Sequence, residues 1–497
     1  MKVTTKSLLA SSIIIERFRL FTRFLLNNPL ITVGIITVFG AILRFYHLGD
    51  RSLWFDEAIE YSISRGSLSD IITQNIQFNS APPLFVISLN FISKIGETEF
   101  YLRLLACVAG IAVIPAMYFL SKEFLSRRSA YFCTFLVAME TLQIHYSQEV
   151  REYSITVLLA ILMLTFFYRY LREQGWKDLV LFTLVGVLAI FSQYGLALML
   201  VALNLVLFVE LFFIKTNRKN LILKWGIAQF FILCAVVLMY QISLKHHLHP
   251  GGWGKHTYLS QGYWNGSLRN FFQLIVFSTY NIIKFAFSYG KLFLFIFPLG
   301  IVAISSQRTV SMMVVFPILV TFAAACLRVY PYLSDRQDIF LTPMIYILAG
   351  FGYEIILKWD AKRFISVVLV LFLLLAGAQH IYLYYQYEGK ENIKPIVNKL
   401  SSLLEDKDKI YIYSGARPAF EYYYKGKRDQ LIYDNRKSRG IAEKEYLQQL
   451  LAQSGRVWMV FSHIYKNEQI LAVHYVSSFR HVKLVDKAKG AFLYLVY

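Results

Sequence analysis

Two adjacent carboxylates, Asp56 and Glu57, are the side chains of this sequence best placed to do chemistry. They lie in the stretch Leu53-Trp54-Phe55-Asp56-Glu57-Ala58, just after the first apolar segment of membrane length. Acidic side chains at the mouth of a membrane protein are costly to desolvate, so they mark a place for acid–base chemistry. In a helix starting here, Glu60 would share a face with Asp56, while Glu57 would point about 100° away. The alternative is structural: Asp56 caps the helix and Glu57 complements its dipole.

A second group of polar side chains occupies the loop His145-Tyr146-Ser147-Gln148-Glu149-Val150-Arg151-Glu152-Tyr153. A loop this short between two apolar segments must hold its side chains close to the membrane surface, where they can meet the first loop. A solvated loop with an internal ion pair is the alternative. The candidate binding residues here are His145, Tyr146, Gln148, Glu149 and Arg151.

A third candidate is Arg336, in the stretch Ser334-Asp335-Arg336-Gln337-Asp338 that enters a later apolar segment. A guanidinium group binds phosphate oxygens through a two-pronged fork, which favours a phosphate site. The alternative is that Arg336 only extends its charged end out of the membrane.

A histidine-containing loop, residues 246–256, is the remaining candidate. Its histidines could hold a metal ion, but its adjacent glycines are first of all typical of a flexible loop. The Gly-Gly-x-Gly run follows no strand and lacks a Gly-Lys-Ser/Thr ending, so it is not a phosphate-binding loop. Whether the protein binds a divalent metal ion therefore stays open.

Composition identifies the class of protein that positions these residues. The chain has 497 residues, of which 57% are hydrophobic and 16% charged, and apolar runs recur from about residue 29 to 384. This is typical of a polytopic membrane protein. The net charge of +20 lies largely in short clusters between apolar runs, which fits membrane orientation and argues against nucleic-acid binding. All four cysteines fall in apolar segments, so a disulfide framework is not expected.

The basic clusters predict the topology, because cytoplasmic loops are enriched in Lys and Arg. Residues 1–28 contain several basic side chains and no membrane-length run, which indicates a cytoplasmic interfacial segment. We expect spans at Pro29–His47, Tyr101–Ser121, Tyr131–Ile144, Tyr153–Tyr170, Leu179–Gln193, Leu196–Ile214, Trp225–Leu244 and near 284–305, 309–327, 337–357 and 364–384.

This topology treats Pro82–Ile95 and Leu268–Ile283 as helices that do not span. The basic clusters between spans then fall on one side, and both long loops fall on the other. We therefore predict a mainly α-helical transmembrane domain over residues 29–387, with about eleven to thirteen spans. Residues 388–497 contain no membrane-length run and alternate helical with strand-like stretches, which predicts a small α/β domain outside the membrane. We expect a helix at Lys394–Leu404 and strands at Lys409–Tyr413, Arg456–Ser462 and Ala491–Tyr497.

Four motifs, taken in order, carry a family resemblance. They are Leu53-Trp54-Phe55-Asp56-Glu57-Ala58, Ala81-Pro82-Pro83-Leu84, Tyr101-Leu102-Arg103-Leu104 and Tyr146-Ser147-Gln148-Glu149-Val150-Arg151-Glu152-Tyr153. The pattern resembles the bacterial relatives of the dolichyl-phosphate-mannose–protein mannosyltransferases (glycosyltransferase family 39). These are integral-membrane glycosyltransferases of the GT-C fold. The resemblance is strongest over residues 40–155.

The resemblance implies transfer of a hexosyl or pentosyl group from a polyprenyl-phosphate donor to a lipid, glycan or protein acceptor. It also implies a multi-pass protein of the bacterial inner membrane, with juxtamembrane helices in the first outer loop and an extracytoplasmic site. Asp56 would act on the acceptor as general base, with Glu57 beside it. Glu149 would line the site, and Arg336, helped by Arg151 or a divalent ion, would bind the donor phosphate. Many relatives have His where this chain has Ala81, which removes any contact made through that histidine.

Two other classes of protein share parts of this pattern. A transporter or flippase of lipid-linked sugars would also have many spans and outer charged residues, although transport sites usually lie near mid-membrane. A non-catalytic membrane scaffold is the third possibility, and an inert Asp56 would favour it.

Overall fold

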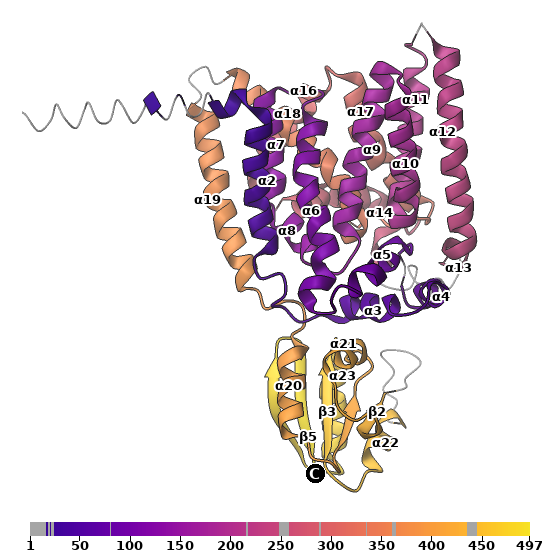
Figure 1. Cartoon of the computed structure of the whole chain (residues 1–497), viewed down its shortest axis with the longest axis vertical. Coiled ribbons are helices and arrows are strands. Elements are labelled where there is room, and N and C mark those ends of the chain that lie inside the picture. The colour runs from indigo at the N-terminus through magenta and orange to yellow at the C-terminus, as the bar shows by residue number, and fades with distance from the viewer. Residues whose placement is uncertain are drawn as a thin grey trace, which may run out of the picture.

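The chain folds into a bundle of membrane-type helices with a small α/β domain attached at one end (Figure 1). The computed structural model describes residues 16, 17, 20, 24–79, 81–214, 217–247, 258–287, 290–333, 335–359, 364–434 and 445–497. The predicted combination of a polytopic helical bundle and a small C-terminal sheet is therefore confirmed.

The bundle is built from long apolar helices that pack side by side. Each predicted span corresponds to a helix, and the span predicted at Tyr131–Ile144 is divided between α7 and α8. The bounds are α2 (Pro29–Phe45), α6 (Glu99–Ser121), α7 (Arg127–Met139), α8 (Thr141–Ser147), α9 (Tyr153–Glu173), α10 (Trp176–Ser192), α11 (Gly195–Glu210), α12 (Arg218–Met239), α16 (Gly290–Ile304), α17 (Arg308–Cys326), α18 (Thr342–Trp359) and α19 (Phe364–Gln386).

Among the described residues, six helices are long and apolar enough to cross a membrane unaided. This is fewer than the number predicted, because several helices of the bundle are shorter. For example, α2 and α10 have 17 residues and α11 has 16.

Shorter helices cover the end of the bundle next to the α/β domain. In Figure 1, α3 (Phe55–Ser64) and α4 (Leu68–Phe78) lie across this end, close to α5 (Leu84–Ser93). The Ser67 side chain accepts a hydrogen bond from the backbone N–H of Asp70, which is a regular N-cap at the start of α4. At 10 residues, α5 agrees with the prediction of a short helix after the two prolines.

The other short elements connect the bundle helices. The π-helix η1 (Tyr240–Leu244) continues α12 and leads into α13 (Lys245–His247), and η2 (Tyr258–Gly262) is a 3₁₀ helix. The predicted helix at Leu268–Ile283 forms α14 (Leu268–Gln273), η3 (Leu274–Ser278) and α15 (Thr279–Ala286), and α15 packs against α16 and α18. The 3₁₀ helix η4 (Arg336–Leu341) runs directly into α18.

The α/β domain contains a five-stranded sheet with strand order β2-β1-β3-β5-β4. Strand β1 pairs in parallel with β2 and β3, whereas β5 is antiparallel to β3 and β4. The strands are β1 (Lys409–Ile412), β2 (Leu431–Tyr433), β3 (Val457–Ser462), β4 (Val482–Ala488) and β5 (Ala491–Val496); the helices are α20 (Ile393–Leu403), α21 (Arg417–Tyr423), η5 (Arg428–Gln430), α22 (Glu445–Leu451) and α23 (Glu468–Ser477). The predicted helix and three strands are present, and β2 and β4 are additional.

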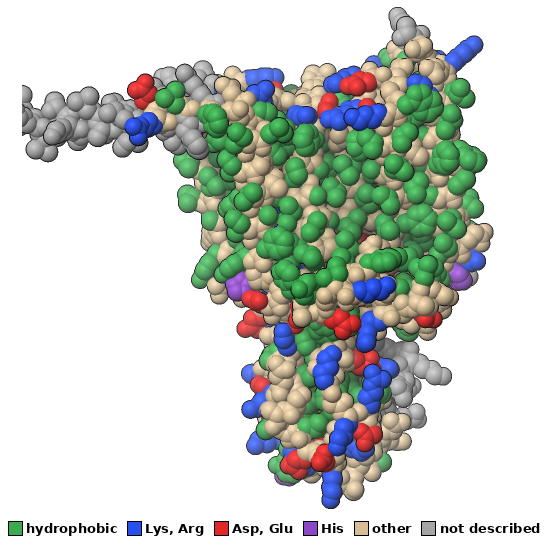
Figure 2. Space-filling model, in the orientation of Figure 1, with side chains coloured by type: hydrophobic (Ala, Val, Ile, Leu, Met, Phe, Trp, Pro, Cys, Tyr) green, Lys and Arg blue, Asp and Glu red, His purple; other side chains and the backbone are tan. Residues whose placement is uncertain are grey.

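Charged side chains gather at both ends of the bundle, and a hydrophobic belt surrounds the helices between them (Figure 2). At the end away from the α/β domain, Arg169 and Arg172 pair with Glu123, and Arg308 pairs with Glu210. The candidate site residues lie at the opposite end, beside the α/β domain. The helices therefore separate the basic clusters from the candidate site.

Candidate active site

Asp56 lies between two guanidinium groups that come from distant parts of the chain. Its Oδ2 atom is 2.7 Å from Nη1 of Arg336 and 3.8 Å from Nη1 of Arg151. Helix α3 begins at Phe55 with Trp54 as its N-cap, so Asp56 lies in the first helical turn and is not the cap. The Asp56 side chain remains 17% exposed and that of Arg336 19%, so both can be reached from outside the fold.

Arg151 connects Asp56 to two further carboxylates. Its Nη1 atom is 3.2 Å from Oε1 of Glu60, and its Nε atom is 3.1 Å from Oε2 of Glu152. Asp56 and Glu60 thus contact the same guanidinium group, in agreement with the predicted helix face that they share. We call Asp56, Glu60, Arg151, Glu152 and Arg336 the Asp56 cluster.

Glu60 has the most unusual environment of the Asp56 cluster. Its side chain is buried, and it accepts a hydrogen bond of 2.9 Å from the Asn79 amide. Burial raises the pKa of Glu60, and although Arg151 opposes this shift, the nearby Glu152 and Asp56 add to it and the pKa reaches about 8. Arg151 is surrounded by acidic groups, and they hold its pKa well above the usual value against the effect of burial.

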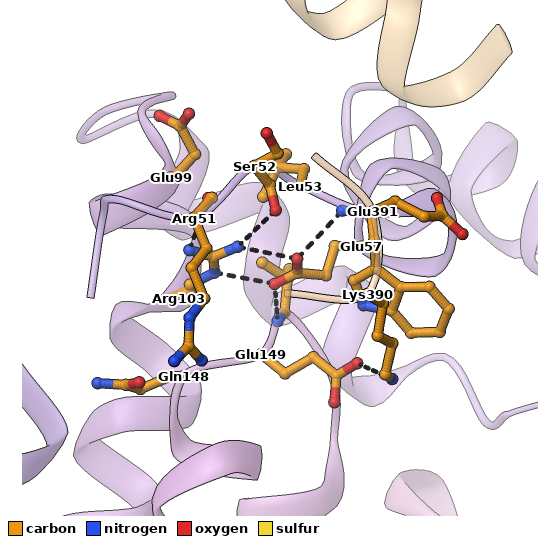
Figure 3. A network of polar contacts seen from close by, with 12 residues as sticks. Arg51, Ser52, Leu53, Glu57, Glu99, Arg103, Gln148, Glu149, Lys390 and Glu391 are labelled. Carbon is orange, nitrogen blue, oxygen red and sulfur yellow. Dashed lines mark hydrogen bonds and ion pairs between the residues drawn. The ribbon is translucent and has the colours of Figure 1, made fainter. Parts of the chain in front are cut away.

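Glu57 is buried and points toward Arg103 (Figure 3). Nε and Nη2 of Arg103 donate to its two oxygens at 2.9 Å each, and the backbone N–H of Val150 donates at 2.8 Å. Both side chains of this pair are almost fully buried. Arg103 also donates to the carbonyl oxygens of Leu48, Arg51 and Ser52. The pair therefore joins the first loop, helix α6 and the second loop.

Glu149 lies in a separate polar cleft, which we call the Glu149 cleft. Its Oε1 atom is 2.9 Å from Nζ of Lys390, and its Oε2 atom is 3.5 Å from Nε2 of His145. Burial alone would raise the pKa of Glu149, but Lys390 and His145 outweigh it and lower the pKa to about 2. The cleft is lined by Arg51, Ser52, Trp54, Glu57, Arg103, His145, Gln148, Glu149, Tyr387, Gly389 and Lys390.

Trp54 lies between the Glu149 cleft and the Asp56 cluster. Nζ of Lys390 is 3.6 Å from the centre of its ring, and the Arg336 guanidinium is 5.8 Å from the same centre. An indole face attracts cations, so one aromatic ring links the positive groups of both sites. Its indole N–H is buried and has no hydrogen-bond partner within the described part of the chain.

The remaining predicted residues are Gln148 and Tyr146, and their contacts hold the fold together. The Gln148 amide donates to the carbonyl oxygens of Arg44 and Tyr46, and it accepts from the Tyr384 hydroxyl at 2.9 Å. Gln148 therefore ties the second loop to α2 and α19. Tyr146 is buried and packs edge-on against Tyr153.

The structure adds residues that sequence reasoning did not select. Arg103 lies in one of the family motifs, and a buried charge at the start of an apolar segment was an available signal. Lys390 and Glu391 gave no such signal, because they resemble any charged linker residue. No group of three or more potential metal ligands occurs among the described residues, and residues 248–257 of the histidine-containing loop are outside them.

Comparisons with known proteins agree with this architecture. The family model for the dolichyl-phosphate-mannose-protein mannosyltransferases matches residues 80–240. The structure of ArnT from Cupriavidus metallidurans bound to undecaprenyl phosphate superposes with a TM-score of 0.60 and 15% identity, over 93% of this chain and 97% of that one. The oligosaccharyltransferase of Archaeoglobus fulgidus gives a TM-score of 0.53 and 10% identity, over 90% of this chain and 71% of that one.

These matches establish the fold. The chain has the GT-C architecture of integral-membrane glycosyltransferases, and the resemblance deduced from the four motifs is confirmed. The comparison with curated proteins gave no significant sequence match.

Proposed function

We propose that this protein transfers a sugar from a polyprenyl-phosphate donor to a hydroxyl group of a lipid, glycan or protein acceptor. The main support is the contact between Asp56 and Arg336, which places a proton acceptor beside a phosphate-binding group in a GT-C fold. A base can take the proton of the attacking hydroxyl group, and a cation can stabilise the charge of the leaving phosphate, so both groups can speed transfer of a glycosyl group from a phosphate.

A lipid-linked donor fits the position of the site at one end of the bundle. A nucleotide sugar carries charges that cannot cross a hydrocarbon layer of about 30 Å unaided. A sugar phosphate tethered to a lipid in the adjacent leaflet can reach the site without crossing. The similar ArnT has been seen with undecaprenyl phosphate bound, which supports a donor of this chemical class.

The distribution of charge supports an extracytoplasmic site. The clusters around Glu123 and Glu210 lie at the end of the bundle opposite Asp56. Basic loops stay in the cytoplasm. The Asp56 cluster and the α/β domain then lie on the extracytoplasmic side of the inner membrane of a bacterium.

In the proposed mechanism, Asp56 is the general base. The acceptor oxygen forms a bond to the anomeric carbon while its proton passes to the Asp56 carboxylate. The bond between the anomeric carbon and the phosphate oxygen breaks, and its electron pair leaves with polyprenyl phosphate. Direct displacement of this kind inverts the anomeric configuration.

Arg336 exchanges its present partner for the substrate in this mechanism. Once the donor is bound, its guanidinium stabilises the negative charge that develops on the leaving phosphate. Arg151 neutralises the surrounding carboxylates and keeps Asp56 oriented.

Glu57 has a positioning role in this proposal. The buried pair with Arg103 holds the loops that carry Asp56 and Arg151, and both oxygens of the Glu57 carboxylate accept hydrogen bonds from Arg103. Glu149 and Lys390 line the adjacent Glu149 cleft, where they are placed to contact the polar part of a substrate.

The direct test is incubation of the purified protein with a radiolabelled polyprenyl-phosphate sugar and candidate acceptors. Label recovered in the acceptor supports a transferase. Movement of the labelled lipid across a vesicle membrane without transfer indicates a flippase instead. If neither transfer nor movement is observed, the protein is non-catalytic.

A further inference from the structure

The four residues that precede Asp56 are attached to the C-terminal part of the chain. This segment, residues 52–55, forms no regular structure until α3 begins at Phe55. Four hydrogen bonds join it to residues beyond 390. The Ser52 hydroxyl donates to Asn392 at 2.7 Å and accepts from the Lys394 N–H at 3.1 Å, the Leu53 N–H donates to the Tyr423 hydroxyl at 2.7 Å, and the Phe55 N–H donates to Glu391 at 3.3 Å.

The carboxylate of Glu391 occupies the N-terminus of α3. It accepts the first backbone N–H of that helix, and a negative charge there is favourable because the helix dipole is positive at this end. Glu391 is itself buried and fixed by the α/β domain, since it contacts Nδ1 of His463 at 2.5 Å and the Ser462 hydroxyl at 3.4 Å. Glu57 accepts the preceding N–H, that of Trp54, from within the helix, so the N-terminus of α3 is capped both locally and by a residue 336 positions away.

The aromatic side chains of the same segment are also held from the C-terminal side. The ring of His463 lies flat on Phe55, with ring centres 4.2 Å apart and planes 4° from parallel. Lys390 lies over Trp54 while its ammonium group pairs with Glu149. The C-terminal side thus holds Trp54 through its side chain and Phe55 through both side chain and backbone.

We propose that Glu391 is a positioning residue that makes the α/β domain a working part of the active site. This inference rests on the proposed transfer reaction. Asp56 follows Phe55 in the first turn of α3, so a movement of that turn changes the distance from the Asp56 carboxylate to the acceptor and to Arg336. A misplacement of about 1 Å can reduce a rate by about 10²-fold.

The alternative is that these contacts only stabilise the packing of the α/β domain. The two explanations differ in what Glu391→Ala changes in the full-length protein. Glu421→Gln is the matched control, because Glu421 is an exposed carboxylate of the same domain that pairs with Arg417. Glu391→Gln is an intermediate variant, because its amide oxygen can still accept the Phe55 N–H but carries no charge.

Two measurements on protein in lipid nanodiscs test the proposal. In hydrogen–deuterium exchange, Glu391→Ala should speed exchange of the amides of residues 53–58 by about tenfold or more, while Glu421→Gln leaves it unchanged. In the transfer assay, Glu391→Ala should lower kcat by about tenfold, Glu391→Gln by less, and neither should change the donor KM or the melting temperature.

Unchanged exchange together with unchanged kcat in Glu391→Ala would overturn the proposal. Faster exchange with normal kcat would also overturn it, because the first turn of α3 would then be loosened without consequence for the reaction. A parallel fall in melting temperature and kcat would support the packing explanation instead. Absence of transfer by the wild-type protein would refute the proposed function, whereas the exchange measurement would still decide whether Glu391 fixes the Asp56 turn.

Discussion

The Arg336 guanidinium lies 2.7 Å from the Asp56 carboxylate, although 280 positions separate the two residues in the chain. The contact joins the first long loop to the 3₁₀ helix that leads into α18. It also brings together the two groups to which the proposed mechanism assigns proton transfer and phosphate binding. The predictions below test what each neighbouring group contributes.

Arg336→Gln should lower kcat by about 10²–10³-fold, which is typical for removing one group that stabilises charge in a transition state. Donor binding should weaken much less, because that charge develops mainly as the bond breaks. Steady-state kinetics with a polyprenyl-phosphate sugar would measure both effects. Arg417→Gln is the control, since Arg417 forms an exposed pair with Glu421 on the α/β domain. Equal turnover in the two variants would remove Arg336 from the mechanism.

Glu57→Gln should act on stability. The substitution leaves the buried Arg103 charge without its partner, which costs about 3–5 kcal/mol in comparable buried pairs. The melting temperature of the purified variant should therefore fall clearly below that of the Glu421→Gln control. If Glu57→Gln melts like the wild type but is inactive, Glu57 takes part in the chemistry directly.

Glu60 should make the protein less stable as the pH rises. Its pKa is raised to about 8 in the folded state, whereas an unfolded chain releases this proton near pH 4.5. Between these values the folded state binds a proton that the unfolded state does not, so the free energy of unfolding decreases with increasing pH. Above about pH 8 both states are ionised and this decrease ends.

Glu60→Gln isolates that contribution, because the amide imitates the neutral carboxyl group. Melting curves of wild type and variant between pH 5 and 8 should diverge, with the wild type losing more stability as the pH rises. Parallel curves would show that Glu60 is ionised throughout this range.

The sidedness of the site can be tested with single cysteines in a background where the four native cysteines are replaced. Ser69 lies on α4, at the end of the bundle that carries the Asp56 cluster, and Ser305 lies near Arg308 at the opposite end. Both positions are exposed, and the substitutions are Ser69→Cys and Ser305→Cys. An impermeant thiol reagent should label the first in intact cells and the second only after the cells are opened. The reverse pattern would place the site in the cytoplasm and exclude a donor lipid that reaches the site from the outer leaflet.

Local sequence features predicted much of this architecture. Hydropathy located the bundle helices, and helical spacing correctly placed Asp56 and Glu60 on one side and Glu57 on another. Strand β4 was not predicted because charged residues such as Lys483 and Lys487 interrupt its apolar pattern, and β2 has only three residues.

The contacts across the chain could not be predicted in the same way. Helical spacing fixes which residues share a face, but it says nothing about which distant residue meets that face. The partners of Asp56 and Glu149 were therefore only partly foreseen: Arg336 was selected for its chemistry, whereas Lys390 and Glu391 came from a linker without a distinctive pattern.

The most direct test of the account is the transfer activity of Asp56→Asn. The amide keeps the size of the side chain but cannot accept the acceptor proton, and loss of a general base typically costs about 10²–10⁴-fold in rate. Asp50→Asn is the matched control, because Asp50 is an exposed carboxylate of the same loop that pairs with His47. With a radiolabelled polyprenyl-phosphate sugar, Asp56→Asn should bind the donor and melt like the wild type, yet transfer sugar at least about 100 times more slowly. Turnover close to that of Asp50→Asn would contradict the assignment of Asp56 as the base.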